Sequence, residues 1–286
     1  MNVYATPDEV KVQIGISGAT HDEHLLRVLV GVSRLIDQAT GRRFAPEVAT
    51  RNLDSKGDDT LWLPVSLLAV TSIQLSDDDG DTYDYTLAGT DYWLSSGAEY
   101  DQYPYQVLVM NPNGNYPTLY AGVRSVKVVG VWGWHDDYDN AWASVDTVQD
   151  DPLTAGATSL TVADIDGVDE WGLTPRIQVG QLLRLGSEFV AVTAVNTGTD
   201  VATIRRGQNG STAASHAQGT AVEVWRPFEG VKQACITQAA RTFKRGQQAF
   251  QDASANVEMG QLYFTRKLDQ DVEALLVDAG LRRVTV

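Results

Sequence analysis

The chain has 286 residues and lacks several features that would cross-link it or place it in a membrane. Its one cysteine, Cys235, excludes an intramolecular disulfide, and its neighbours Ala234 and Ile236 indicate a small buried side chain. No run of about 18 apolar residues is present, which argues against a transmembrane helix. The first ten residues, MNVYATPDEV, have neither a basic start nor an apolar core, so we expect no secretory signal and no membrane partner.

Positive charge is also scarce. The chain has 22 Lys and Arg against 37 Asp and Glu, which gives a formal net charge of −15. This excess of negative charge argues against a function in binding nucleic acid. Residues 226–286 have nine bases and seven acids, a charge of +2, whereas the preceding 225 residues have 13 bases and 30 acids, a charge of −17. This asymmetry favours a contact between unlike surfaces over a catalytic cleft.

Motifs for chemistry are absent too. No phosphate-binding loop, dinucleotide fingerprint or nucleophile elbow is present, and the four histidines do not have metal-ligand spacing. The acidic run Asp77–Asp81 departs from the calcium-loop pattern and is better explained as a hairpin turn at Asp79-Gly80. A cation bound by Trp134–Asp139 is a weaker alternative to a solvated loop. We therefore expect no enzyme activity, cofactor or metal.

Two regions of helical periodicity lie at the ends of the chain. Thr6-Pro7-Asp8-Glu9 is typical of a capped helix start, and a second helix begins near Asp22 and ends at Gly41. Helical periodicity returns after Pro227, and a final helix is predicted over Leu268–Ala279.

Strand-like alternation fills the region between these helices. Five predicted strands between Thr50 and about Trp134 form an antiparallel meander, and their sequences are TLWLP, AVTSIQL, YDYTL, YQVLVM and VRSVKVVGVWGW. A second group begins near Asp151-Pro152, with strands at Ser159–Val162, Val201–Arg205 and Ala221–Trp225 and a hairpin over Leu182–Val195.

These patterns predict an α+β fold. Two N-terminal and two C-terminal helices would form a helical core that carries the antiparallel meander and an inserted, small β-barrel-like module. The predicted parts are 1–150, the inserted module 151–226, and 227–286, whose helices pack back on the first part. We expect the module to fold independently.

Four short sequences follow one another in this chain as they do in a known family. In this order the chain resembles the head–tail connector, or adaptor, proteins of long-tailed double-stranded DNA bacteriophages. The four sequences are ATGRRF, LWLP, VKVVGVWGW and QAARTFKR, and the resemblance covers residues 5–135 and 226–250. The segment containing RGQNGSTAASH is similar to a β module found in phage structural proteins.

The resemblance implies a structural virion protein at the head–tail junction, made in the host cytoplasm. Its expected partners are the portal protein, a tail-terminator or other neck protein, and further copies of itself in a ring, expected to be a dodecamer. Genomic DNA would pass through this ring without specific binding. Portal docking is expected from Ala253 onward, and the predicted portal or ring contacts are Arg241, Lys244, Arg245, Arg266, Lys267, Leu275 and Leu276.

Two alternatives from other classes stay open at this point. One is a receptor- or carbohydrate-binding phage tail or baseplate protein that uses the Gly/Ser-rich module. The many tryptophans and tyrosines could stack on sugars if they are exposed, although burial in cores or protomer contacts is commoner. The other is a hydrolase without a recognisable motif.

Overall fold

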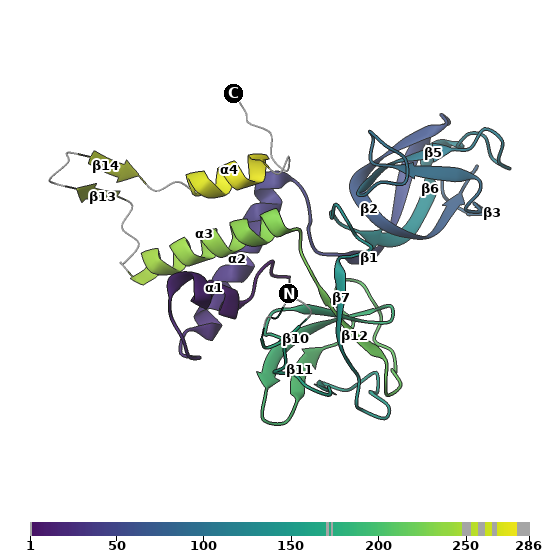
Figure 1. Cartoon of the computed structure of the whole chain (residues 1–286). Helices are drawn as coiled ribbons and strands as arrows, with labels where there is room; N and C mark the ends of the chain where they lie inside the picture. Colours follow the sequence, from purple (N-terminus) through teal and green to yellow (C-terminus); the bar gives the residue numbers. More distant parts are fainter. Residues whose placement is uncertain are drawn as a thin grey trace. The chain divides into compact units, whose positions relative to one another are not determined.

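A computed structural model shows that the protein is mostly β (Figure 1). The structure describes residues 2–169, 172, 174–247, 253–256, 261–264 and 268–278. Two antiparallel sheets of six strands each account for most of the described secondary structure. The four helices of the described residues are short, and 21% of these residues are helical. The predicted α+β fold with a helical core is therefore wrong.

The physical reason for this error is the distribution of buried apolar side chains. Each six-stranded sheet encloses its own hydrophobic cluster, so the sheets do not depend on helices for burial. The prediction treated the strands as insertions because helices separated in sequence must pack together. That argument explains helix contacts, but it does not decide which part of the molecule holds most of the core.

The chain divides into two compact units. Unit 1 comprises Met1–Gly41, Ala143–Gln208 and Ala213–Val286, and unit 2 comprises Arg42–Trp142 and Asn209–Thr212. The predicted boundaries at residues 150/151 and 226/227 stay a prediction. Within the described residues, no helix is long and apolar enough to span a membrane.

The helices belong to unit 1. They are α1 (Pro7–Ile14), α2 (Asp22–Thr40), α3 (Glu229–Gln247) and α4 (Gln270–Asp278). Thr6 caps α1 in a capping box with Glu9, and Gly41 ends α2 in the left-handed conformation, as the sequence predicts. Helix α3 packs against each of the other three helices, so the N-terminal helices α1 and α2 and the C-terminal helix α4 all contact it (Figure 1).

Unit 2 contains the first sheet, with strand order β1-β6-β2-β5-β4 and with β3 paired to β2. Its strands are β1 (Glu47–Lys56), β2 (Thr60–Leu75), β3 (Tyr85–Thr86), β4 (Tyr92–Ser95), β5 (Tyr105–Met110) and β6 (Ala121–Trp132). Strand β2 runs through both LWLP and AVTSIQL, which the sequence suggested as separate strands. It pairs with β5 at its start and with β6 along its second half.

A close approach between β2 and β6 requires glycine at position 130. A Cβ added to Gly130 would lie 2.2 Å from the backbone oxygen of Ala69, and a backbone atom in a ladder cannot move aside. Gly130 therefore allows β6 to cross β2 at this distance.

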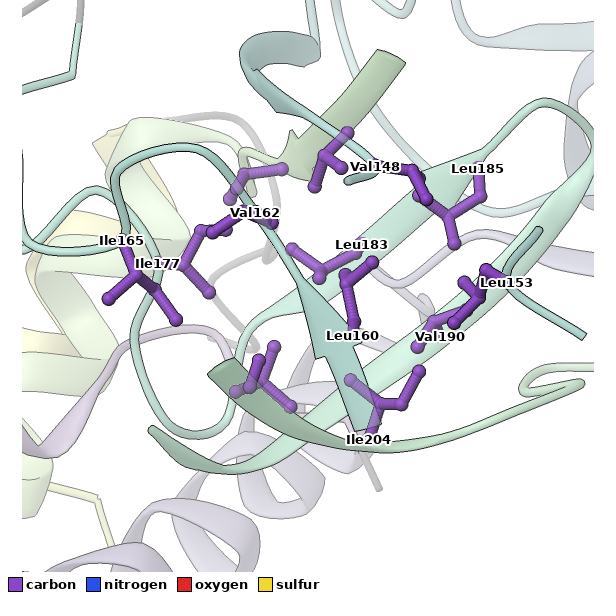
Figure 2. Packing of buried hydrophobic residues seen from close by; sticks show 14 residues of the cluster. Val148, Leu153, Leu160, Val162, Ile165, Ile177, Leu183, Leu185, Val190 and Ile204 are labelled. Carbon is purple, nitrogen blue, oxygen red and sulfur yellow. The ribbon is translucent and has the colours of Figure 1, made fainter. Parts of the chain in front are cut away.

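The second sheet lies in unit 1, with strand order β7-β12-β9-β10-β11-β8. Its strands are β7 (Trp142–Thr147), β8 (Ser159–Thr161), β9 (Leu182–Leu185), β10 (Glu188–Asn196), β11 (Val201–Arg205) and β12 (Ala221–Trp225). Figure 2 shows aliphatic side chains from these strands and their loops directed into one interior, among them Leu160, Leu183 and Ile204. The predicted strands at 201–205 and 221–225 and the hairpin at Gly186-Ser187 are confirmed.

A two-stranded sheet follows α3 in the chain. It consists of β13 (Ala253–Asn256) and β14 (Gln261–Phe264), which pair antiparallel with each other.

Candidate functional site

The predicted contact residues on α3 have different environments. Arg241 forms ion pairs with Asp269 and Asp271, at the start of α4. Gln238 accepts a hydrogen bond from the backbone N–H of Asp269 at 3.0 Å. These contacts attach the first turn of α4 to α3, so Arg241 has a partner within its own chain.

Lys244 and Arg245 lie one turn further along α3. Lys244 is exposed, whereas Arg245 is half-buried and lines a groove between α2 and α3. Among the described residues, the buried Nε of Arg245 has no hydrogen-bond partner. Because this atom is buried, it cannot itself bind a group from outside the protomer.

The groove between α2 and α3 has a volume of 380 Å³. Three aliphatic side chains of α2 line it, Val28, Val32 and Leu35, and Gly31 leaves space beside them. The other lining residues are Arg27 of α2 and Gln238, Thr242 and Arg245 of α3. The groove thus combines an apolar lining with two arginines, and we call it the α2–α3 groove.

The other predicted contacts lie towards the C-terminus. Leu276 of α4 is fully buried and Leu275 is half-buried, so Leu276 belongs to the packing of α4. Arg266 and Lys267 lie outside the described residues.

The most extensive buried polar cluster of the β module is centred on Glu188, the first residue of β10. Arg206 donates two hydrogen bonds to this carboxylate, Nε to Oε1 and Nη2 to Oε2, each at 2.7 Å. The ring of His216 lies 2.9 Å from Oε2 through its Nε2. Backbone N–H groups of Gly207 and Ala214 complete the set at 3.0 Å each.

This cluster explains the RGQNGSTAASH motif. Burial alone raises the pKa of Glu188, but hydrogen bonds from Arg206, His216 and the two backbone amides outweigh burial and lower the pKa to about 2. A carboxylate with no exposed area is thus kept ionised and surrounded by donors. The motif residues hold a long loop in place, and the cluster has no free nucleophile or open coordination position.

The middle of the same loop contacts β1 within unit 2. Asn209 accepts a hydrogen bond from the backbone N–H of Val48 at 2.8 Å and donates one from its side chain to the Pro46 oxygen at 2.9 Å. Gly210 has φ +78°, and a Cβ there would lie 2.1 Å from the Val48 oxygen. Glycine is required for this contact as well.

The acidic stretches that suggested cations have partners in their own chain. Asp78 accepts hydrogen bonds from Ser76 and Thr82, which lower its pKa to about 2, and Asp79-Gly80 forms a turn with positive φ at both residues. In the second stretch, Asp139 accepts from Tyr103 at 2.9 Å and Asp137 accepts from Asn140 at 2.8 Å.

One group of three carboxylates was not selected from the sequence. Asp164, Asp166 and Asp200 have ligand atoms within 4.8 Å of one another, the one such group found in the described part of the chain. The guanidinium of Arg176 lies 3.0 Å from Asp164, and Asp200 accepts the backbone N–H of Ile165 at 3.0 Å. The chain itself therefore compensates part of this charge, and nothing else points to an ion.

In the described part of the chain, the thiol and two of the histidines that could act as nucleophile or base lie in packed environments. Cys235 is buried 3.6 Å from the Ser33 hydroxyl, and burial raises the pKa of its thiol to about 12. His21 and His24 both pack against the Phe243 ring, with centroids 5.3 Å away, so they contribute to the α2–α3 contact.

A pocket of 370 Å³ in unit 1 is lined by the N-terminal segment, the second sheet and the start of α3. Three acidic and three basic side chains line it, and they include the Lys232–Glu9 pair at 2.6 Å and the Arg226–Asp169 pair at 3.8 Å. Because these charges balance, the pocket has no evident preference for a charged ligand.

No protein-family model matches this chain, and no curated protein matches it either.

Proposed function

We propose that the chain is a structural subunit of a head–tail adaptor, which assembles as an oligomeric ring between the capsid portal and the neck of a long-tailed DNA bacteriophage. One observation carries the proposal. The four sequences that resemble the adaptor family lie in two pairs of contacting elements. The helix that ends in ATGRRF packs on the helix that contains QAARTFKR, and the strand with LWLP pairs with the strand that contains VKVVGVW.

The charge of the chain supports a passive role towards DNA. A ring of about twelve copies at −15 each would have a formal charge on the order of −180, which repels a polyanion, although salt screens this beyond about 10 Å. We expect the channel surface to be acidic or neutral, and Lys244 and Arg245 to make protein contacts. A portal contact through the C-terminal region is part of the same proposal.

The test uses the full chain, alone and mixed with a portal protein. Native mass spectrometry measures the mass of the assemblies, and negative-stain electron microscopy shows whether they are closed rings. Closed rings that bind the portal are the expected result. A chain that stays monomeric under all these conditions, with no portal binding, would contradict the proposal. Micromolar duplex binding at about 0.1 M salt, lost on neutralising Lys244 and Arg245, would contradict the passive role.

The alternative of a receptor- or carbohydrate-binding protein was based on the Gly/Ser-rich module. In that module the loop's Arg206 and His216 bind Glu188. These side chains are therefore engaged in holding the loop, and the module's strands enclose a closed aliphatic core.

A further inference from the structure

Unit 2 has an exposed aromatic surface on one side of its sheet. Trp62 of β2 and Trp93 of β4 lie opposite Val107 and Val109 of the strand between them, so all four side chains share one face. The next residue of β5 on the other face, Leu108, is buried in the core. Trp62 is 65% exposed and Trp93 40% exposed.

Neighbouring groups hold these rings in position. Tyr100, itself 59% exposed, packs edge-on against Trp93 with centroids 6.2 Å apart. The Trp62 ring lies over Gly97, where a Cβ would come within 3.3 Å of it. We call Trp62, Trp93, Tyr100 and Val109 the aromatic face. Large exposed aromatic groups gathered in this way are typical of binding surfaces.

The charge around the aromatic face has one sign. Residues 57–123, which include β2 to β5, have ten acidic residues, nine Asp and Glu99, and no Lys or Arg. Glu99 and Asp101 flank Tyr100 directly, and Asp59 precedes β2. A partner of this face should therefore be apolar and positively charged.

The α2–α3 groove has those properties. Its lining is aliphatic at Val28, Val32 and Leu35, and its bases are Arg245 and Arg27, of which Arg27 also forms an exposed ion pair with Glu23. The last turn of α3 has Lys244 and Arg245, whereas its other two bases, Lys232 and Arg241, form ion pairs within the chain. Arginine also stacks well on aromatic rings, as Arg42 does on Trp134 and Arg51 on Trp132 in this protein.

We propose that the aromatic face of one protomer binds the α2–α3 groove of a second copy of the chain. This inference rests on the proposed ring function, because a ring of identical subunits needs two different and complementary surfaces on each protomer. The aromatic rings would cover the apolar groove, and Glu99 and Asp101 would approach Arg27 and Arg245. An interface of this composition has its aromatic and arginine contacts at the centre.

The test uses two variants of the full chain that each disable one surface. Trp62→Gln removes the most exposed ring of the aromatic face. Gly31→Glu places a negative side chain in the groove, at a helical position where a Cβ meets no atom within 4 Å. Both sites are exposed, so both variants should fold, which circular dichroism and thermal unfolding would verify.

Each variant alone should associate at least about 30-fold more weakly than the wild type, as expected for an interface centre. An equimolar mixture should form 1:1 heterodimers in native mass spectrometry, because one intact face and one intact groove remain. Val123→Gln and Gly156→Glu are the matched controls, since Val123 is 59% exposed outside the aromatic face and Gly156 also has open space. Both controls should assemble like the wild type.

Wild-type rings with unchanged assembly of both variants would overturn this inference and leave the ring function intact. A monomeric wild type would overturn both. Unchanged assembly, together with a fluorescence change on adding N-acetylglucosamine oligomers that is lost in Trp62→Gln, would instead assign the aromatic face to carbohydrate. Variants that lose association but form no heterodimer when mixed would also overturn the proposed pairing.

Discussion

The carboxylate of Glu188 and the guanidinium of Arg206 form a two-pronged ion pair in which the side chains are 0% and 7% exposed. A second pair of the same type lies in the same sheet, between Arg184 and Glu223, at 2.7 and 2.8 Å. Its side chains are 27% and 21% exposed. Both pairs join an arginine to a glutamate, and they differ in burial. The partly exposed Arg184–Glu223 pair is therefore a control for the effect of burial on the Glu188–Arg206 pair.

Glu188→Gln should destabilise the β module by about 3–5 kcal/mol, because it leaves the buried guanidinium of Arg206 without its counter-charge. Glu223→Gln should cost about 1 kcal/mol or less, since water solvates the remaining arginine. Urea unfolding of the full chain measures both. Equal losses in the two variants would show that burial does not determine the contribution of these pairs.

The same carboxylate makes stability depend on pH. The pKa of Glu188 is lowered from 4.5 to about 2 in the folded protein. Between these values the unfolded chain binds the proton more readily, so the contribution of Glu188 is complete above about pH 4.5 and is lost as pH falls towards 2. The urea midpoint should therefore fall less steeply from pH 6 to pH 3 in Glu188→Gln than in the wild type. Parallel slopes would contradict this assignment.

Gly130→Ala should destabilise unit 2 by about 3 kcal/mol, at the upper end for added volume in a packed site. The added Cβ meets the Ala69 oxygen, and relief would require breaking the β2–β6 ladder. Gly89→Ala is the control in the same unit, because a Cβ there has open space and the change should stay within about 0.5 kcal/mol. Thermal unfolding distinguishes them, and a tolerated Gly130→Ala would mean that the strands can separate locally.

Arg241→Ala should loosen α4. The change removes the ion pairs to Asp269 and Asp271, and a helix of nine residues is not stable without such contacts. Hydrogen exchange of the α4 amides should become about fivefold faster, as expected for about 1 kcal/mol from two partly exposed pairs. Lys244→Ala, one turn away on the exposed side, should leave this exchange unchanged. Identical exchange in both variants would show that apolar packing alone holds α4.

Local sequence patterns predicted several helices and strands well, but they did not predict that the fold is mostly β. Strands β11 and β12 were predicted with their observed bounds, because each alternates apolar and polar residues between turn-forming segments. Strand β1 gave a weak signal because its residues, EVATRNLDSK, are mostly polar. The fold class was wrong because contacts between distant helices were given more weight than the many short strands.

The side-chain contacts of the candidate sites join residues far apart in the chain, and their spacing in the sequence does not predict these contacts. Glu188 lies 18 and 28 residues before its partners Arg206 and His216, and the loop joining them has no periodic pattern. The sequence offers one signal for this cluster, which is that Glu188 begins the apolar run EFVAV. A carboxylate in a buried strand needs hydrogen-bond donors nearby. The pairing of Arg241 with Asp269 likewise depends on α4 folding back on α3.

The loop from Arg206 to His216 has a consequence for cleavage of the native chain. Its composition of glycine and small polar residues is that of a segment open to proteolysis. The Arg206 side chain that trypsin would recognise is bound to Glu188, and both ends of the loop are fixed by the same carboxylate. A protease can therefore cut after Arg206 only when the contacts to Glu188 break, so the rate of cleavage at this bond reports the opening of that buried cluster.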